Sequence, residues 1–84
     1  MTRVLAANDL ILLGLLAAGQ TAVVESVLGA SDDIHRLREI GLRDGVTVQM
    51  LQPGNPCLLR LDGHKLGVRS EALATVLVRP EQWA

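Results

Sequence analysis

The stretch from Ser31 to Leu51, SDDIHRLREIGLRDGVTVQML, contains a helix, the end of that helix, a turn and the start of a strand. A serine followed by two aspartates is typical of a helix N-terminus, because the hydroxyl caps a free amide and the carboxylates lie at the positive end of the helix dipole. The sequence therefore predicts a helix that begins after Ser31. Its apolar residues recur at three-residue spacing on one face: Ile34, Leu37 and Ile40.

Gly41 is expected to end this helix in a left-handed backbone conformation. In that position it makes Leu42 and Leu37 the two residues that touch in a Schellman motif. The following residues, Leu42–Gly45, carry the aspartate and the closing glycine of a tight turn. Alternating apolar and polar residues after Gly45 then predict a half-buried strand from Val46 to Leu51.

Two apolar segments precede the helix. Thr21 to Leu28, TAVVESVL, is rich in β-branched residues and predicts a strand, and its nearly continuous apolar character indicates a central place in a sheet. Leu10 to Ala18, LILLGLLAA, predicts a short core segment with one or two helical turns, and the residues before it form either an edge strand or a loose terminus. Alternation places four residues on one face of the predicted strand: Ala22, Val24, Ser26 and Leu28.

A hairpin follows the helix and its strand. The dipeptide Asp62-Gly63 between two alternating segments is typical of a two-residue type I′ turn, and this geometry pairs Arg60 with Lys65 and Leu58 with Gly67. One face of the hairpin then points toward the core: Cys57, Leu59, Leu61, Leu66 and Val68. The other face, with the residue after it, carries Leu58, Arg60, Lys65 and Arg69.

The remaining segments complete a mostly β fold. Gln52 to Pro56 is rich in proline and glycine and predicts a loop, Ser70 to Leu73 predicts one helical turn capped by Ser70, and Thr75 to Val78 predicts a last strand. About five short strands with one helix after the first are too few for two sheets, so a small closed β-barrel is expected. Residues 1–84 form a single domain in this interpretation.

Composition excludes several classes of function. The 84 residues carry eight Lys and Arg against nine Asp and Glu, so the net charge of −1 predicts no general attraction to nucleic acid or anionic lipid. One cysteine cannot form an internal disulfide, which fits a reducing compartment. The apolar run is about half the ~20 residues of a transmembrane helix, so membrane insertion is not expected. A secretory signal is the alternative for this run, favoured by Arg3 and opposed by Asp9.

Residues that could ligate a metal are few. Cys57 and His64 lie on one hairpin face, but their separation of about 13 Å along the strands is too large for one tetrahedral ion. His35 lies alone on the helix. These three side chains could therefore hold iron or zinc only in a site shared between two chains. No enzyme signature is present in the sequence, so binding is a more plausible activity than catalysis.

The outer face of the hairpin is the predicted partner-binding surface. Arg60 and Lys65 are directly opposed there, and like charges in that relation are mildly destabilising. A partner that uses both charges would explain why they are present, and a solvated surface with acidic neighbours is the alternative. Leu58 adds an apolar side chain that is expected to be exposed, and Arg69 extends the same surface.

Two segments resemble the FeoA family. Arg36 to Val46, RLREIGLRDGV, resembles its RLxxMGLxPG motif, with Ile40 in the place of methionine and Asp44 where proline is frequent. Gly54 to Val78, GNPCLLRLDGHKLGVRSEALATVLV, resembles GDPxxxxVxGxxxALRxxEAxxIxV, with asparagine for aspartate and Gly67 for alanine. The resemblance covers about residues 18–78. Six residues form the structural motif, because they belong to the matched segments and set the backbone geometry of the helix end and the turns: Leu37, Gly41, Leu42, Gly45, Asp62 and Gly63.

The resemblance implies a fold and a function. It implies a small SH3-like β-barrel in the cytoplasm, peripheral to the inner membrane, that assists bacterial ferrous iron uptake by binding the cytoplasmic part of the membrane transporter FeoB. It implies no catalysis and no agreed iron ligands. The alternative is a metal-binding or metal-sensing module, since the same barrel is the C-terminal module of iron-dependent repressors. The chain has no room for a helix-turn-helix, so a nucleic acid partner is not expected.

Overall fold

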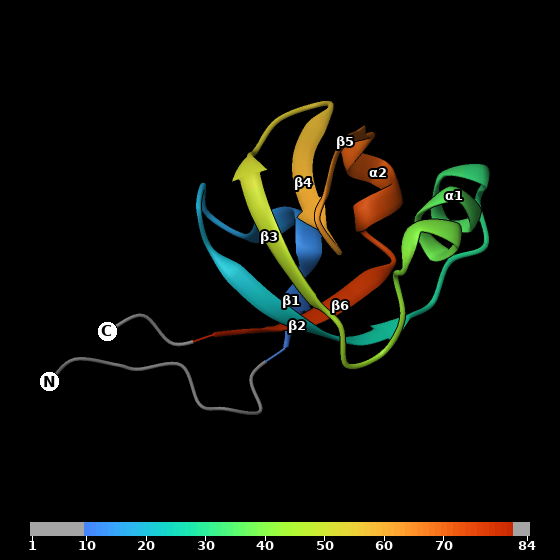
Figure 1. The fold of residues 1–84 in the computed structure, drawn as a ribbon, viewed down its shortest axis with the longest axis horizontal. Coiled ribbons are helices and arrows are strands. Elements are labelled where there is room, and N and C mark those ends of the chain that lie inside the picture. The colour runs from blue at the N-terminus through green and yellow to red at the C-terminus, as the bar shows by residue number, and fades with distance from the viewer. Residues whose placement is uncertain (1–9, 82–84) are drawn as a thin grey trace, which may run out of the picture.

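The structure is a computed structural model that describes residues 10–81. The expectation for the first eight residues lies outside this range. Six antiparallel strands form one sheet in the order β1-β6-β2-β3-β4-β5 (Figure 1). The strands are β1 (Ile11–Leu12), β2 (Thr21–Val27), β3 (Thr47–Gln52), β4 (Cys57–Leu61), β5 (His64–Val68) and β6 (Val76–Pro80). The helices are α1 (Asp32–Ile40), α2 (Ser70–Leu73) and the 3-10 helix η1 (Leu13–Leu15).

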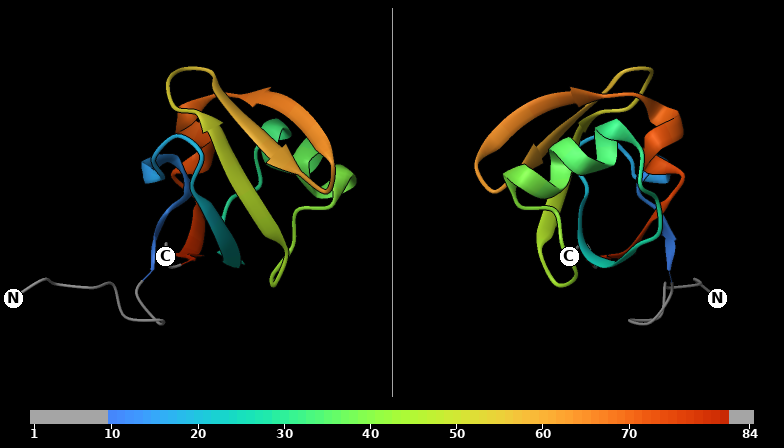
Figure 2. Two further views of the ribbon diagram at one scale, coloured as in Figure 1. Left: turned by 60° about the vertical axis from the view of Figure 1, so that its left-hand side comes forward. Right: turned by 90° about the vertical axis from the view of Figure 1, so that its right-hand side faces the viewer.

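The mostly β architecture is confirmed, with two differences in the sheet. It has six strands because Ile11–Leu12 pairs with β6, and two residues are too short to give an alternating pattern in the sequence. The sheet curls around the core but is not closed, since β1 and β5 are its two ends and do not pair with each other. Figure 2 shows the curled sheet, with α1 running across its open side next to the hairpin.

The predicted ends of α1 are confirmed. The Oγ of Ser31 accepts a hydrogen bond from Ile34 N–H at 3.2 Å, as an N-cap does. At the other end Gly41 has a φ of 139°, which L side chains rarely adopt. Leu42 N–H donates to Leu37 O at 2.9 Å and Gly41 N–H to Arg38 O at 3.2 Å, the two hydrogen bonds of a Schellman motif.

The turn after α1 lies one residue later than predicted. Val46 N–H donates to Arg43 O at 3.2 Å, so the turn spans Arg43 to Val46 and Gly45 occupies its third position with a φ of 90°. Gly45 N–H also donates to Val24 O at 2.7 Å, which ties the turn to β2. The start of β3 consequently shifts to Thr47.

The core lies inside the curled sheet and is mainly leucine and valine, which compensates for the near absence of aromatic residues from the sequence. Among residues 10–81 no polar or charged side chain is buried. None of the helices in this range is long and apolar enough to cross a membrane. The largest fully buried side chains come from every part of the chain: Leu13, Leu16, Val24, Ile34, Leu37, Val48, Met50, Leu59, Leu61, Val68, Leu73 and Val76.

The predicted face of β2 is wrong at its C-terminal end. The pairing of β2 with β6 shifts by one residue between Val24 and Ser26, so Glu25 is the extra residue of a β-bulge. A bulge reverses the side on which every later side chain points. Val27 therefore packs against the core, and Leu28, which alternation placed on the same face as the buried Ala22 and Val24, is 71% exposed. The central position predicted for β2 is confirmed, since it lies between β6 and β3.

The predicted cap of α2 is also wrong. Ser70 makes no side-chain cap, and its N–H instead donates to Oδ1 of Asn55 at 3.2 Å. Asn55 belongs to the predicted loop between β3 and β4, so this loop side chain caps the helix. The last strand is β6, which starts one residue later than expected and includes Pro80 as its last residue.

Candidate partner-binding surface

The β4–β5 hairpin forms the surface that the sequence predicts to bind a partner. Asp62 and Gly63 have φ values of 51° and 80°, both positive as a type I′ turn requires. The structure reproduces the full predicted register: Cys57 pairs with Val68, Leu58 with Gly67, Leu59 with Leu66, Arg60 with Lys65, and Leu61 with His64. The core face is as predicted, except that Leu66 is half-buried.

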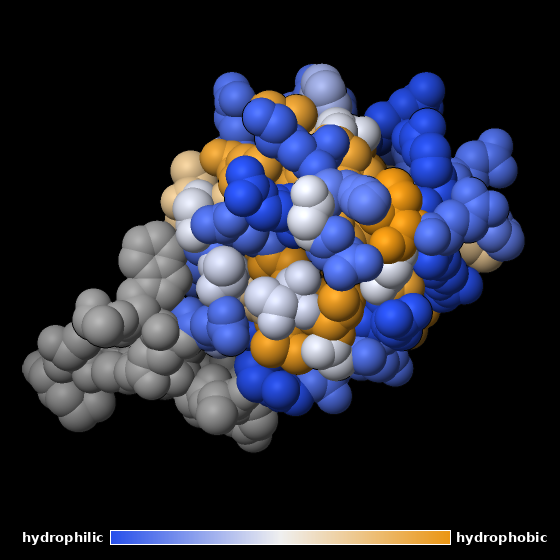
Figure 3. Space-filling model, in the orientation of Figure 1, coloured by the Kyte–Doolittle hydropathy of each residue, from blue (hydrophilic) through white to orange (hydrophobic). Residues whose placement is uncertain are grey.

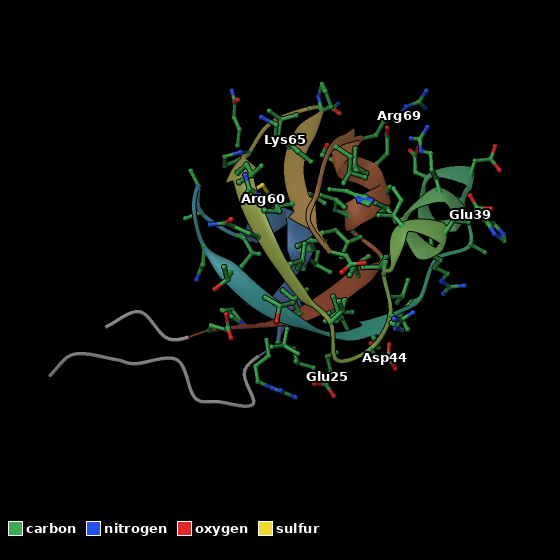
Figure 4. The ribbon with its side chains drawn as sticks, in the orientation of Figure 1. Glu25, Glu39, Asp44, Arg60, Lys65 and Arg69 are labelled. Carbon is green, nitrogen blue, oxygen red and sulfur yellow. The ribbon has the colours of Figure 1, made fainter. Side chains whose placement is uncertain are left out.

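Arg60 and Lys65 are exposed and lie side by side on the outer face (Figure 4). Leu58 is half-buried rather than exposed, which corrects the expectation. The reason is Gly67 opposite it: a Cβ at Gly67 would stand 3.7 Å from Leu58 Cδ2, so Leu58 lies over the glycine. The surface is therefore more polar than predicted, with Leu58 as a partly covered apolar base. Figure 3 shows the resulting mixture of hydrophilic and hydrophobic residues on this side of the molecule.

Arg69 is exposed at the junction of β5 and α2. It lines a groove of about 580 Å³ that no sequence pattern indicated. The groove separates the N-terminal half of α1 from the end of β5 and the start of α2. A local pattern could not reveal it, because it brings together residues up to 38 positions apart. Its lining residues are Asp33, Arg36, Asn55, Pro56, Gly67, Arg69 and Glu71.

The cations of this surface make no ion pair with another described residue. The ion pairs within residues 10–81 join Arg36 to Asp33 at 2.9 Å and Arg79 to Glu25. Arg60, Lys65 and Arg69 are in neither of them. Figure 4 shows these three on the hairpin side of the molecule, whereas Glu25 and Asp44 lie at the opposite end. The outer face of the hairpin therefore carries unpaired positive charge at Arg60 and Lys65, whereas Arg69 shares its groove with Asp33, Arg36 and Glu71.

The three candidate metal ligands do not come together. Cys57 is 1% exposed, and its Sγ donates to Gly54 O at 2.8 Å, so this thiol is out of reach of a second chain. That removes Cys57 from the shared site suggested by the sequence. His35 and His64 are both exposed, on α1 and at the hairpin turn. Within residues 10–81 no group of three or more potential ligands is suitably placed for a metal ion.

The sequence profile of the FeoA domain matches residues 11–80 of the chain. The chain belongs to the FeoA family. The family is associated with ferrous iron transport. No curated protein matches the chain at a significant level.

Solved structures of FeoA proteins have the same fold as this FeoA-family chain. The zinc complex of Stenotrophomonas maltophilia FeoA, described as a procaryotic SH3 domain protein, is 33% identical with a TM-score of 0.71, over 86% of this chain and 96% of that one. FeoA from Chlorobium tepidum is 26% identical with a TM-score of 0.75, over 88% and 81%. The SH3-like fold predicted from the resemblance is thereby confirmed.

The fold also occurs as part of a longer chain. IdeR from T. acidophilum matches with a TM-score of 0.77 and 18% identity, over 92% of this chain but 37% of that one. At this identity the likeness concerns the fold alone. The family residues Gly41, Leu42 and Gly45 are accounted for by the Schellman motif and the turn, so they identify the fold and do not mark a site.

Proposed function

We propose that this chain is an accessory regulatory protein of bacterial ferrous iron uptake that binds the cytoplasmic, nucleotide-binding part of a FeoB transporter. Membership of the FeoA family supports the process. The binding surface is the outer face of the hairpin with Arg69. The observation that supports it is the concentration of exposed cations, Arg60, Lys65 and Arg69, that have no anionic partner among the described residues.

Such a protein acts by differential binding. Charges at an interface steer encounter and select the partner, and a partly covered apolar base beside them excludes water once the partner is bound. Leu58 provides that base beside Gly67. The chain changes transport only as far as it binds one conformation of the transporter more tightly than another. In this proposal it needs no catalytic group and resides in the cytoplasm, peripheral to the inner membrane through its partner.

The test is a titration of the transporter's soluble cytoplasmic part with the full chain, in the nucleotide-free, diphosphate and triphosphate states. Isothermal calorimetry gives the Kd in each state. Saturable binding with Kd values that differ between states supports both the docking and the conformational bias. Absence of binding in all three states overturns the proposed function.

A second candidate is a metal site shared between two chains, supported by the zinc in the Stenotrophomonas maltophilia structure and by the exposure of His35 and His64 here. Iron or zinc bound between two copies should raise the molecular mass to that of a dimer. Light scattering with and without ZnCl₂ measures this. His35→Ala and His64→Ala should abolish the shift, whereas Cys57→Ala should retain it because its thiol is buried. A monomer at saturating zinc contradicts this candidate.

A further inference from the structure

Strand β5 forms an open edge of the sheet. It pairs with β4 on one side, and no strand pairs with its other side within residues 10–81. Three of its five residues, His64, Lys65 and Gly67, are exposed. An unpaired edge presents a row of free N–H and C=O groups to any strand that approaches it.

The hairpin geometry identifies which groups are free. In a two-residue hairpin the residues that flank the turn, Leu61 and His64, exchange both backbone hydrogen bonds, and every second pair repeats this pattern. Leu66 and Val68 therefore bond to β4. The N–H and C=O groups of Lys65 and Gly67 point away from β4, along the open edge.

Helix α1 turns this edge into one wall of a groove. At one end α1 contacts the hairpin turn, since a Cβ at Gly41 would stand 3.5 Å from the Cβ of Asp62. At the other end of α1 the groove of about 580 Å³ opens between Arg36 and Gly67. A single extended segment beside β5 would enter this space.

The charges around the edge indicate the chemistry of that segment. Lys65 and Arg69 lie on the strand and just after it, and neither forms an ion pair with a described residue. The other charged residues that line the groove are Arg36, which is paired with Asp33, and Glu71. A second copy of β5 would bring its own Lys65 and Arg69 against these, and like charges across strands are unfavourable. An extended segment with carboxylate side chains has the complementary charge.

We propose that β5 binds an extended acidic segment of the protein partner as a seventh strand, through the backbone groups of Lys65 and Gly67 and with carboxylates against Lys65 and Arg69. The identity of the partner rests on the proposed function. Backbone pairing supplies affinity in such strand addition, and the flanking side chains supply specificity. Strand addition depends on the open edge of β5. Attraction between charges on the hairpin face would not by itself require it.

Gly67 permits a matched pair of variants. Gly67→Ala keeps the N–H and adds a methyl that meets Leu58 Cδ2 at 3.7 Å and Pro56 Cβ at 3.8 Å, both ordinary contacts. Gly67→Pro adds the same carbon but removes the N–H and puts a ring on the open edge. Proline is tolerated on an edge strand where its nitrogen faces outward, so the hairpin should persist.

Calorimetric titration of the transporter's soluble cytoplasmic part gives the Kd for each chain. We expect Gly67→Ala to bind within about twofold of the unmodified chain and Gly67→Pro to bind about tenfold or more weakly, because one hydrogen bond is lost and the added strand is displaced. Thermal unfolding of both variants establishes that the fold is intact.

Amide hydrogen exchange tests the same proposal without a substitution. In the free protein the amides of Lys65 and Gly67 should exchange fast while those of Leu66 and Val68 are protected. Binding should slow the exchange of Lys65 and Gly67 by about tenfold or more, because both amides become hydrogen-bonded. This measurement decides the matter if Gly67→Pro does not fold.

The outcomes separate the two proposals. If the unmodified chain does not bind the transporter, the proposed function fails and the named partner of β5 fails with it. If the chain binds but both Gly67 variants bind equally well, or the Lys65 and Gly67 amides stay fast in the complex, strand addition is overturned and the proposed function stands. If Gly67→Pro instead abolishes a dimer of this chain, the occupant is a second copy and the proposal is wrong.

Discussion

The α-carbon of Gly29 lies directly against the side chain of Thr75. A Cβ at Gly29 would stand 2.4 Å from Thr75 Oγ1 and 2.8 Å from Thr75 Cβ, closer than real side chains approach. Thr75 cannot easily move away, because its Oγ1 donates to Ala72 O at 2.9 Å and its carbonyl accepts from Leu28 N–H at 2.8 Å. The end of β2 and the start of β6 therefore meet where only glycine fits.

Gly29→Ala should lower the free energy of unfolding by about 1–3 kcal/mol, since the added methyl forces the two segments apart. Urea denaturation followed by circular dichroism measures this change. Gly14→Ala is the control, because its Cβ would meet Leu73 Cβ at 3.6 Å, an ordinary contact. Equal losses in the two variants would show that the Gly29 contact is not specifically restrictive.

Val27 and Leu28 exchange the places that simple alternation assigns to them. Val27 pairs with the buried Val76 and packs against the core, whereas Leu28 is 71% exposed. We expect Leu28→Gln to change the free energy of unfolding by less than about 0.5 kcal/mol, as exposed positions do. Val27→Gln should destabilise by about 1–3 kcal/mol, because it puts an amide against the core. Thermal unfolding of both variants compares them, and a larger loss at Leu28 would contradict the bulge at Glu25.

The features that could be predicted from the sequence are those fixed by neighbouring residues. The hairpin register follows from Asp62-Gly63, because a type I′ turn needs positive φ at both positions and leaves one pairing of the strands. The end of α1 at Gly41 is likewise determined by neighbouring residues, through the Schellman motif. The outer-face cations could therefore be placed together before the fold was known, although Leu58 was assigned too much exposure.

The features that could not be predicted depend on distant segments. A bulge is set by the partner strand, and Glu25 lies 50 or more positions from the β6 residues that impose it. The open edge at β5 depends on how far the whole sheet curls, which no local pattern encodes. The groove beside Gly67 likewise depends on where α1 lies.

The Asn55–Ser70 hydrogen bond illustrates this limit and can be tested. Asn55→Ala removes the oxygen that accepts from Ser70 N–H at 3.2 Å, and loss of such a cap costs about 0.5–2 kcal/mol. Asn55→Asp keeps an acceptor at the same place, so its stability should stay close to that of the unmodified chain. Differential scanning calorimetry gives both values. If alanine and aspartate are equally destabilising, the side-chain oxygen is not the stabilising group.

Arg60→Glu should separate binding from stability on the hairpin face. The substitution replaces two like charges across the strands with a pair of opposite charges, because a carboxylate would then face Lys65, so stability should rise by about 0.2–1 kcal/mol. Binding to the transporter's cytoplasmic part should weaken about tenfold, because the reversal removes one attraction and adds one repulsion of similar size. Chemical denaturation and calorimetric titration measure the two quantities on the same preparation.

Arg43→Glu is the matched control, because it makes the same change in charge at an exposed position next to Asp44, at the far end of the molecule in Figure 4. It should leave the affinity within about twofold, since exposed charges separated by more than ~10 Å are screened at ordinary salt. A rise in the free energy of unfolding together with a loss of affinity in Arg60→Glu would exclude unfolding as the cause of weaker binding. Equal weakening by both substitutions would instead indicate that only net charge matters, and the hairpin face would lose its assigned role.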